Sequence, residues 1–267
     1  MAGQQFALAL SEHPFFEVVQ MVTSRNVKTY REALLEKDGT SRWTQPEEIP
    51  ADMAELPVVS SENFRPEAVD VIFTAVESDL ARELEPRFAQ TTPTFSTASA
   101  FRYEDDTPLL IAGVNDHLAS FVRLQQERRN WKGFVLAIPN CTVTGLAITL
   151  APLAECFGVE KVLMVSMQAV SGAGRSPGVR VLDSLDNIIP YIPKEEEKVR
   201  RELVKILATR SGDTLIPAPI AVNCLCTRAA VLDGHTEAVF VGLKEKPSVD
   251  EVIAVWRGHN PLAGRNL

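Results

Sequence analysis

Apolar and polar positions alternate in blocks along the first half of the chain, and the blocks predict strands separated by helices. Runs that are apolar almost throughout predict buried strands, whereas apolar residues spaced i, i+3, i+4 predict helices. Strands are predicted over residues 15–22, 69–75, 94–97, 109–113 and 134–138. Helices are predicted over residues 4–12, 78–89 and 115–127, the last capped by Asn115. This alternation predicts a parallel sheet covered on both faces, in an α/β domain of the nucleotide-binding type over residues 1–140.

The pattern changes after residue 140. Helices are predicted over residues 142–157, 179–189, 195–208 and 249–256, and strands over residues 159–170, 220–231 and 236–243. Because the strands are grouped and the helices segregated, we expect an α+β domain with a mixed sheet over residues 141–267, suited to catalysis or dimerisation. Residues 37–60 are polar and contain prolines without clear periodicity, which predicts a long surface excursion.

Composition narrows the classes of partner. The chain has 267 residues, and its formal net charge of −8 is the wrong sign for holding a phosphate backbone by general electrostatics. Its apolar runs are far shorter than the roughly 20 residues that cross a bilayer, and the N-terminus lacks a basic segment followed by an apolar one. Four cysteines without a CxxC pair predict neither a disulfide framework nor a metal site. We therefore expect a cytoplasmic protein that binds neither nucleic acid nor membranes.

Cys141 is the candidate nucleophile. It lies in the segment Pro139-Asn140-Cys141-Thr142, where a predicted buried strand ends and a helix begins. The positive end of the helix dipole and the unpaired N–H groups are expected to stabilise its thiolate and lower its pKa. The same N–H groups could stabilise an oxyanion formed when the thiolate attacks a carbonyl. A small buried residue at a tight turn has the same local signature, so position alone leaves both interpretations open.

His235 is the candidate proton donor and acceptor. It lies in the turn Asp233-Gly234-His235-Thr236-Glu237 between two predicted strands. Imidazole is the simplest base near pH 7 for activating a thiol. A histidine satisfied within a turn would show the same pattern.

Three further segments have roles that local sequence leaves undecided. Arg228 follows a predicted strand and is either a bidentate clamp for a carboxylate or a solvated strand-end residue. Glu195 opens a predicted helix, where acidic residues complement the dipole for structural reasons alone. The loop Ser171–Gly174 follows a strand and is a weak indication that backbone approaches a cofactor.

Four segments, taken in order along the chain, resemble the aspartate-semialdehyde dehydrogenase family, in particular its fungal and archaeal branch. They are IPNCTVTGL around Cys141, MQAVSGAGRSPGV from Met167, LDNIIPYIPKEEEKVRRELVKIL from Leu185 and CTRAAVLDGHTEAVFV from Cys226. Weaker similarity covers most of the rest, from GQQFALALSEHPFFEV onward. The resemblance implies a Rossmann-type NADP-binding domain and a catalytic and dimerisation domain. It also implies reductive dephosphorylation of β-aspartyl phosphate to aspartate semialdehyde with NADPH, on the route to lysine, threonine, methionine and isoleucine.

The resemblance further implies a role for individual residues. Cys141 would form the thioacyl enzyme, with His235 as acid and base. The implied substrate contacts are Arg228 at the α-carboxylate, Gln168 at the thioester, Glu195 at the amino group, and Arg102, Lys198 and Asn115 at the phosphate. The implied cofactor contacts are Ser24 and Arg25 at the 2′-phosphate of NADP, Ser78, and the loop of Ser171, Gly172, Ala173 and Gly174. Family members are dimers or tetramers, so we expect a homo-oligomer.

Departures from the family pattern bear on the expected activity. The family begins with a strand and a glycine-rich turn, GATGxVG, whereas this chain starts at Met1-Ala2-Gly3, at about the last glycine. We expect the absence of that strand and of the pyrophosphate-binding amides to weaken cofactor binding. Beyond Val252 we expect part of the catalytic sheet and a returning helix to be absent as well. The segment around Arg102 differs from the family's usual NYRMD run.

Two alternatives remain beside an active enzyme of this kind. One is a truncated, catalytically impaired relative that keeps the substrate-site residues but does not bind the cofactor. The other is an acyl reductase that resembles malonyl-CoA reductase. Arg228 and Glu195 favour an amino-acid substrate over this second alternative.

Overall fold

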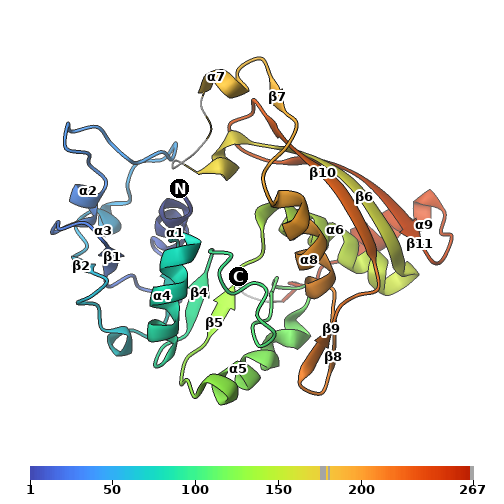
Figure 1. Cartoon of the computed structure of the whole chain (residues 1–267), viewed down its shortest axis with the longest axis horizontal. Helices are drawn as coiled ribbons and strands as arrows, with labels where there is room; N and C mark the ends of the chain where they lie inside the picture. The colour runs from blue at the N-terminus through green and yellow to red at the C-terminus, as the bar shows by residue number, and fades with distance from the viewer. Residues whose placement is uncertain (175–178, 180, 265–267) are drawn as a thin grey trace.

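The protein, described here as a computed structural model over residues 1–174, 179 and 181–264, consists of two halves that lie side by side (Figure 1). The first half, blue to green in Figure 1, contains short parallel strands, and the second half, yellow to red, contains a larger mixed sheet. This arrangement agrees with the predicted fold class, an α/β domain followed by an α+β domain with a mixed sheet.

The first half is built around three parallel strands in the order β3-β4-β5, with a separate parallel pair, β1-β2. Helix α4 covers the three-stranded sheet because Ala81, Glu85, Phe88 and Ala89 form one buried stripe along it. The elements are α1 (Ala2–Leu10), β1 (Met21–Thr23), α2 (Tyr30–Ala33), α3 (Ala51–Ala54), β2 (Val58–Ser60), η1 (Pro66–Ala68), β3 (Ile72–Thr74), α4 (Ser78–Ala89), β4 (Thr94–Ser96), η2 (Asp116–Phe121), α5 (Val122–Arg129) and β5 (Val135–Ala137).

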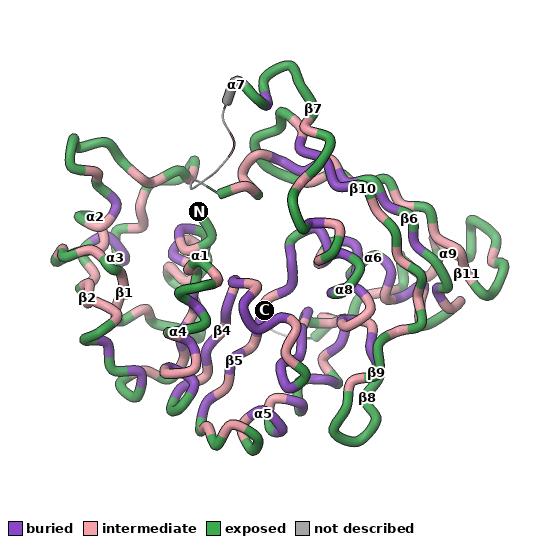
Figure 2. The backbone as a smooth tube through the Cα atoms, viewed as in Figure 1, coloured by how far each residue is buried: buried purple, intermediate pink, exposed green. Residues whose placement is uncertain are grey.

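The second half is a four-stranded sheet in the order β11-β6-β10-β7, with β6 parallel to β10 and antiparallel to β11. Helices α6 and α8 pack on one face and enclose the largest core, which Figure 2 shows in purple along both helices. The elements are α6 (Cys141–Phe157), β6 (Val159–Gln168), η3 (Val170–Ala173), α7 (Val181–Ser184), β7 (Ile188–Ile189), α8 (Glu195–Ile206), β8 (Thr209–Ser211), β9 (Thr214–Ile216), β10 (Ala221–Ala229), β11 (Thr236–Leu243) and α9 (Val249–Gly258).

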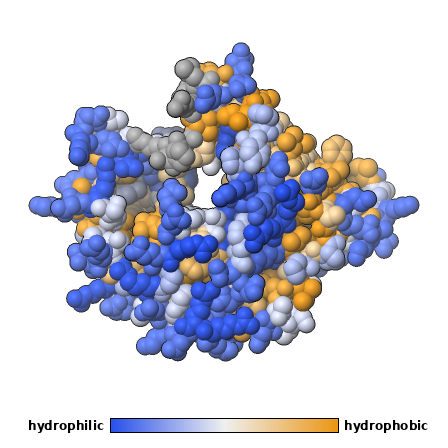
Figure 3. Space-filling model, in the orientation of Figure 1, coloured by the Kyte–Doolittle hydropathy of each residue, from blue (hydrophilic) through white to orange (hydrophobic). Residues whose placement is uncertain are grey.

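The opposite face of this sheet is apolar and exposed. Along β6, buried Val162 and Met164 alternate with Leu163 and Val165, which are 52% and 38% exposed. Phe240 pairs with Leu163 in the register and is 72% exposed, and Leu225 pairs with Val165. Figure 3 shows hydrophobic residues gathered over this side of the molecule. One face of the sheet therefore forms the core, and the other forms an uncovered apolar surface.

Several predicted elements of the first half differ in the structure. The strand predicted over residues 15–22 is confined to β1, and Phe15 lies 65% exposed in a loop. Residues 109–113 form no strand, since Leu109 makes only an isolated bridge to Ala137. The helix predicted over residues 115–127 begins with the 3-10 turn η2, and the Asn115 side chain does not cap it. Its amide instead accepts from the Ile111 N–H and donates to the carbonyls of Leu109 and Ile206, which ties the stretch before η2 to the end of α8.

The remaining differences involve short elements. The expected excursion over residues 37–60 contains α3 and β2, and Met53 in α3 is buried. The helix expected over residues 179–189 is reduced to the single turn α7 and the two-residue strand β7, and its residue 180 lies outside the described residues. The hairpin β8–β9 was not predicted. Apolar periodicity carries little information over segments of three or four residues, where tertiary contacts decide the conformation.

Candidate active site

The site is centred on Cys141, the first residue of α6. Asn140 precedes it as the N-cap, and its Oδ1 accepts from the N–H groups of Thr142 (3.0 Å) and Val143 (3.3 Å). This cap fixes the N-terminus of α6 shortly after the end of β5. Two of the first-turn N–H groups considered for oxyanion binding are therefore already engaged.

His235 lies beside this cysteine although 94 residues separate them, with Nε2 3.2 Å from Sγ. The turn before β11 presents the ring, and the Ala169 N–H donates to its Nδ1 at 3.1 Å. A nitrogen that accepts cannot carry the proton of a neutral imidazole, so that proton is on Nε2 and faces the sulfur. Burial and then the charge of Arg228 lower the pKa of His235, which favours the neutral ring.

The thiol is less acidic than its place at a helix N-terminus predicts. Burial first, and the Glu195 carboxylate second, raise the pKa of Cys141 above its usual value, although hydrogen bonding to the Thr142 backbone opposes the shift. The prediction of a lowered pKa is therefore wrong. Desolvation and a nearby like charge outweigh the dipole of α6.

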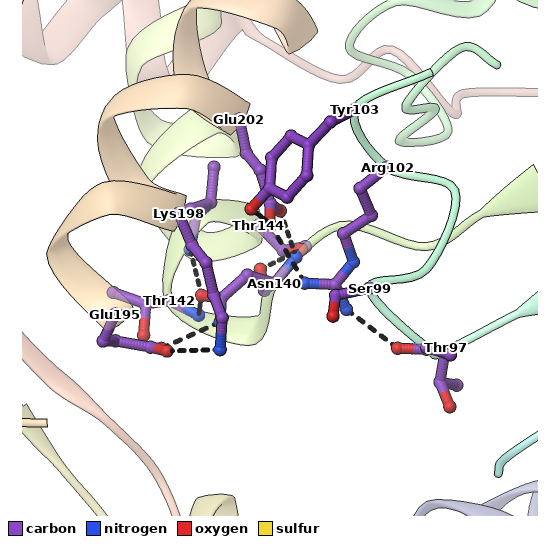
Figure 4. Close-up of polar contacts among 12 residues, drawn as sticks. Thr97, Ser99, Arg102, Tyr103, Asn140, Thr142, Thr144, Glu195, Lys198 and Glu202 are labelled. Carbon is purple, nitrogen blue, oxygen red and sulfur yellow. Dashed lines mark hydrogen bonds and ion pairs between the residues drawn. The ribbon is translucent and has the colours of Figure 1, made fainter. Parts of the chain in front are cut away.

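Glu195 connects the helix cap to the second sheet (Figure 4). Its Oε1 accepts from Asn140 Nδ2 at 2.8 Å and from Gln168 Nε2 at 3.3 Å, and its Oε2 lies 3.1 Å from Lys198 Nζ. Burial opposes ionisation of this carboxyl, but the charge of Lys198 and the hydrogen bonds together keep its pKa below the usual value. Glu195 is therefore a buried, ionised carboxylate at the base of the site.

A second carboxylate, Glu202, holds the other side of the cap (Figure 4). Its Oε2 accepts from the Asn140 N–H at 2.7 Å, and its Oε1 accepts from Arg102 Nη1 and from the Tyr103 hydroxyl, both at 3.1 Å. Arg102 also donates to the Thr97 carbonyl at 2.8 Å, and its side chain is 9% exposed. The charge of Arg102 is thus already balanced within the protein.

Arg228, at the end of β10, differs from Arg102 in its pairing. Its Nη1 donates to the Ala169 carbonyl at 2.7 Å, and the residue is 5% exposed. No carboxylate ion pair joins Arg228 to the part of the chain that the structure describes. Ala169 therefore contacts both predicted site residues through its main chain, with its carbonyl on Arg228 and its N–H on His235.

Asn140, Glu202 and Tyr103 were not singled out from the sequence. A signal for Glu202 was present, because Glu195, Lys198 and Glu202 are spaced i, i+3, i+7 and share one face of α8. Asn140 also precedes the helix as a favoured N-cap residue. No local pattern indicates Tyr103, because its role depends on a contact with Glu202 across 99 residues.

The predicted cofactor residues lie in three places. The Arg25 guanidinium, 28% exposed, donates to the carbonyls of Ala33 (2.9 Å) and Leu35 (2.5 Å) and pairs with Glu36 at 2.9 Å. The hydroxyl of Ser78 lies 2.8 Å from that of Ser99 at the start of α4. Neither group contacts the Cys141 cluster.

The glycine loop, in contrast, lies directly against the site. A Cβ on Gly172 would lie 3.1 Å from both Arg228 Nη1 and His235 Cε1, so glycine is what allows this approach. The predicted phosphate contact Asn115 is not brought to the site, because its amide is bonded to backbone at Leu109, Ile111 and Ile206.

A cavity of about 780 Å³ opens beside Cys141 and His235, between α6, β11 and α9. Its walls are largely apolar and include Leu150 and Trp256. Glu237 also lines it, and burial raises the pKa of this carboxyl to about 7. Within the described residues, no group of three or more metal-ligating side chains comes together and no helix has the length and apolarity to span a membrane.

Two family models match the chain. The model described as "Semialdehyde dehydrogenase, NAD binding domain" matches residues 1–120, and the one described as "Semialdehyde dehydrogenase, dimerisation domain" matches residues 150–262. The first covers the predicted cofactor contacts Ser24, Arg25 and Ser78, and the second covers the glycine loop Ser171–Gly174 together with β6, α8, β10 and β11.

Individual proteins are similar over nearly the whole chain. The aspartate-semialdehyde dehydrogenase of Archaeoglobus fulgidus is 39% identical over 265 residues, which cover 98% of this chain and 74% of that protein. The enzyme of Methanothermobacter thermautotrophicus is 37% identical over 254 residues, or 94% of this chain and 71% of the relative. The crystal structure of the Candida albicans enzyme with NADP superposes with a TM-score of 0.81 and 33% identity, covering 96% of this chain and 73% of that one.

Proposed function

The chain belongs to the aspartate-semialdehyde dehydrogenase family, and on that premise we propose that it reduces β-aspartyl phosphate to aspartate semialdehyde and phosphate with NADPH. The role in amino-acid biosynthesis follows from the family. The observation that carries the proposal is the 3.2 Å contact between Cys141 Sγ and His235 Nε2, next to a buried arginine and a buried carboxylate.

The first step uses Cys141 as the nucleophile. The Cys141 thiol is exposed and first loses its proton to solvent water. The thiolate then attacks the carbonyl carbon of the acyl phosphate, the C–S bond forms, and the C–O bond to phosphate breaks with the bonding pair leaving on phosphate. When bound, NADPH would supply the hydride that reduces the thioester carbon. The C–S bond then breaks with its electron pair on the Cys141 sulfur, which releases the aldehyde and restores the thiolate. His235 holds its Nε2 proton toward the sulfur and the reacting oxygen, where it stabilises negative charge as it develops.

Arg228 and Glu195 supply opposite charges for an amino-acid substrate. Arg228 is a buried cation without a carboxylate partner in the described chain, which suits the substrate α-carboxylate. Glu195 is ionised and suits the substrate ammonium group. Gln168, hydrogen-bonded to Glu195, completes this side of the site.

The phosphate contacts proposed for Arg102 and Lys198 rest on weaker support, because each cation is already paired with a carboxylate. A phosphate would compete with Glu195 for Lys198, whose side chain is 31% exposed. Arg102, at 9% exposed, is more deeply committed to Glu202. We therefore assign the larger share of phosphate recognition to Lys198.

The family's NAD-binding domain makes a nicotinamide cofactor part of this assignment, and we propose NADP as its form. Three observations fit it: a partly exposed Arg25, a serine hydroxyl pair at the start of α4, and a glycine loop that reaches the catalytic pair. Figure 3 shows a hollow between the two halves, which α1 and α8 flank in Figure 1. Arg25, Ser24, Ser78 and the loop of residues 171–174 would hold the cofactor there.

The chain contains the family's dimerisation domain, and we propose that it forms a homo-oligomer through the outer face of the second sheet. That face exposes Leu163, Val165, Leu225 and Phe240 side by side, an apolar patch of the kind that marks a protein–protein interface. A molar mass in solution equal to a dimer or tetramer would support this arrangement, whereas a monomer at all concentrations would contradict it.

The test of the reaction is phosphate-dependent reduction of NADP by aspartate semialdehyde, followed by the absorbance of NADPH. We expect turnover by the wild-type protein and a loss of about 10³-fold or more in Cys141→Ala. Cys156→Ala, at the exposed far end of the same helix, is the matched control and should keep wild-type activity. Unchanged turnover in Cys141→Ala, or none in a folded wild-type protein, would contradict the proposal.

A further inference from the structure

A second cavity, of about 430 Å³, lies where the two halves of the molecule meet away from Cys141. In Figure 1 it corresponds to the region where α5 and the β8–β9 hairpin approach α8. The first half contributes Tyr103, Asp105 and Arg128, and α8 contributes Arg201 and Lys205. The hairpin contributes Asp213, Thr214 and Leu215. None of the predicted substrate or cofactor residues lines it.

Three cationic residues, Arg128, Arg201 and Lys205, line the cavity. Lys205 Nζ donates to the carbonyls of Arg102 (2.8 Å) and Glu104 (2.7 Å), which uses two of its three N–H bonds. Arg201 lies over the ring of Tyr103, 3.9 Å from its centroid, so its guanidinium is held at the wall of the cavity. Arg128 faces them from α5 and reaches the Asp213 carbonyl at 3.5 Å.

The cavity also holds the complementary chemistry. The carboxylates of Asp105 and Asp213 line it, and Asp213 lies 4.0 Å from Arg210 in a long, exposed ion pair. The rest of the wall is apolar, formed by Val204, Ala208, Leu215 and Pro217. Cations, carboxylates and an apolar wall within one small cavity match a zwitterion with a hydrocarbon side chain more closely than a simple anion.

We propose that this cavity binds a free α-amino acid with an apolar side chain. The ligand carboxylate contacts Arg128, Arg201 and the remaining N–H of Lys205, and its ammonium group contacts Asp105 or Asp213. The cavity shares Tyr103 with the catalytic cluster, because the Tyr103 hydroxyl donates to Glu202. It also adjoins Arg102, whose carbonyl accepts from Lys205, but neither Cys141 nor His235 lines it.

The test is calorimetric titration of the whole chain with L-valine, isobutylamine and 3-methylbutanoate, which keep the same branched carbon chain but carry both charges, the ammonium only or the carboxylate only. We expect L-valine to bind at least tenfold more tightly than either analogue, since each analogue loses the charge-assisted contacts of one of the two groups. Equal binding of L-valine and 3-methylbutanoate, or no binding of L-valine up to about 10 mM, would overturn the proposal.

Two variants locate the binding. Arg201→Met and Asp213→Asn, both at exposed positions, should each weaken L-valine binding about tenfold or more. Arg200→Met, next along α8 and outside the cavity, is the matched control and should leave binding unchanged. Arg228→Met tests whether L-valine binds at the proposed catalytic site instead, because that site also has charges suited to an amino acid. Binding lost in Arg228→Met and retained in Arg201→Met would overturn the assignment.

Discussion

The cluster around Cys141 and Asn140, the proposed catalytic site, and Arg25, the proposed cofactor contact, are held by contacts of different range. Asn140 is bonded to Glu195 and Glu202, 55 and 62 residues away, and Glu202 is bonded to Arg102 across 100 residues. All the hydrogen bonds of the Arg25 side chain lie within 11 residues. A group fixed by distant buried partners depends on the whole fold, whereas a group fixed by its own loop can be altered without affecting the rest.

The largest expected effect comes from removing the proton donor of the cluster. His235→Asn should lower kcat by about 10²–10⁴-fold, because within the described residues His235 is the group held 3.2 Å from the Cys141 sulfur with a proton directed at it. Steady-state kinetics in the phosphate-dependent assay measure this, with Asp233→Asn in the same turn as control. A kcat within a factor of two of the wild-type value would show that His235 does not act in the rate-limiting chemistry.

Removing the charge of Glu202, which bonds to Arg102 and Asn140 across long stretches of chain, should destabilise the fold. In Glu202→Gln the buried Arg102 guanidinium loses its carboxylate, and the free energy of unfolding should fall by about 3 kcal/mol. Glu197→Gln, on the same helix, removes an exposed pair with Arg201 and should change it by less than about 1 kcal/mol. Denaturant unfolding of both variants checks the difference. Equal decreases in the free energy of unfolding would mean that the contacts of Glu202 contribute no more stability than an exposed ion pair.

The same difference in range explains how much of the molecule could be predicted from its sequence. Helices α4, α6 and α8 carry long apolar stripes, and their predicted bounds agree with the structure to within two residues at each end. The pairing of Cys141 with His235 was expected only through the family resemblance, because nothing local joins two segments 94 residues apart. Glu202 was missed for the same reason, although it lies on the same face of α8 as Glu195 and Lys198.

The predicted acidity of Cys141 shows where local reasoning fails. A helix N-terminus is visible in the sequence, and it favours a thiolate. Desolvation of the thiol by neighbouring groups and the approach of Glu195 are tertiary effects, and they raise the pKa of Cys141 instead. Likewise Asn115 has the sequence signature of a cap, but its amide binds the backbone of Leu109 and Ile111 and that of Ile206, 91 residues away. A sequence motif can identify a functional residue, whereas the pKa and the hydrogen-bond partners of that residue depend on the fold.

The influence of Glu195 on the thiol can be measured directly. Its negative charge raises the pKa of Cys141, so Glu195→Gln should lower that pKa and populate the thiolate at lower pH. Alkylation by iodoacetamide should then be several-fold faster near pH 8, with its pH profile displaced to lower pH. Glu196→Gln, the next residue on α8, is the control. A profile that does not move, or moves to higher pH, would contradict the assigned direction.

The smallest expected effect lies on the cofactor side. Arg25 pairs with Glu36 at 2.9 Å, and both side chains are about one third exposed, so solvent weakens the pair. A 2′-phosphate that binds Arg25 must compete with Glu36, and Glu36→Gln should therefore tighten NADPH binding by a few-fold, less than about 1 kcal/mol. NADH lacks the 2′-phosphate, and its affinity should not change. Fluorescence titration with both cofactors separates these outcomes, with Glu55→Gln, which removes a comparable exposed pair with Arg31, as control. An equal increase in affinity for NADPH and NADH would show that Arg25 does not recognise the 2′-phosphate. The loss of the Glu36 charge would then affect binding of the shared part of both cofactors.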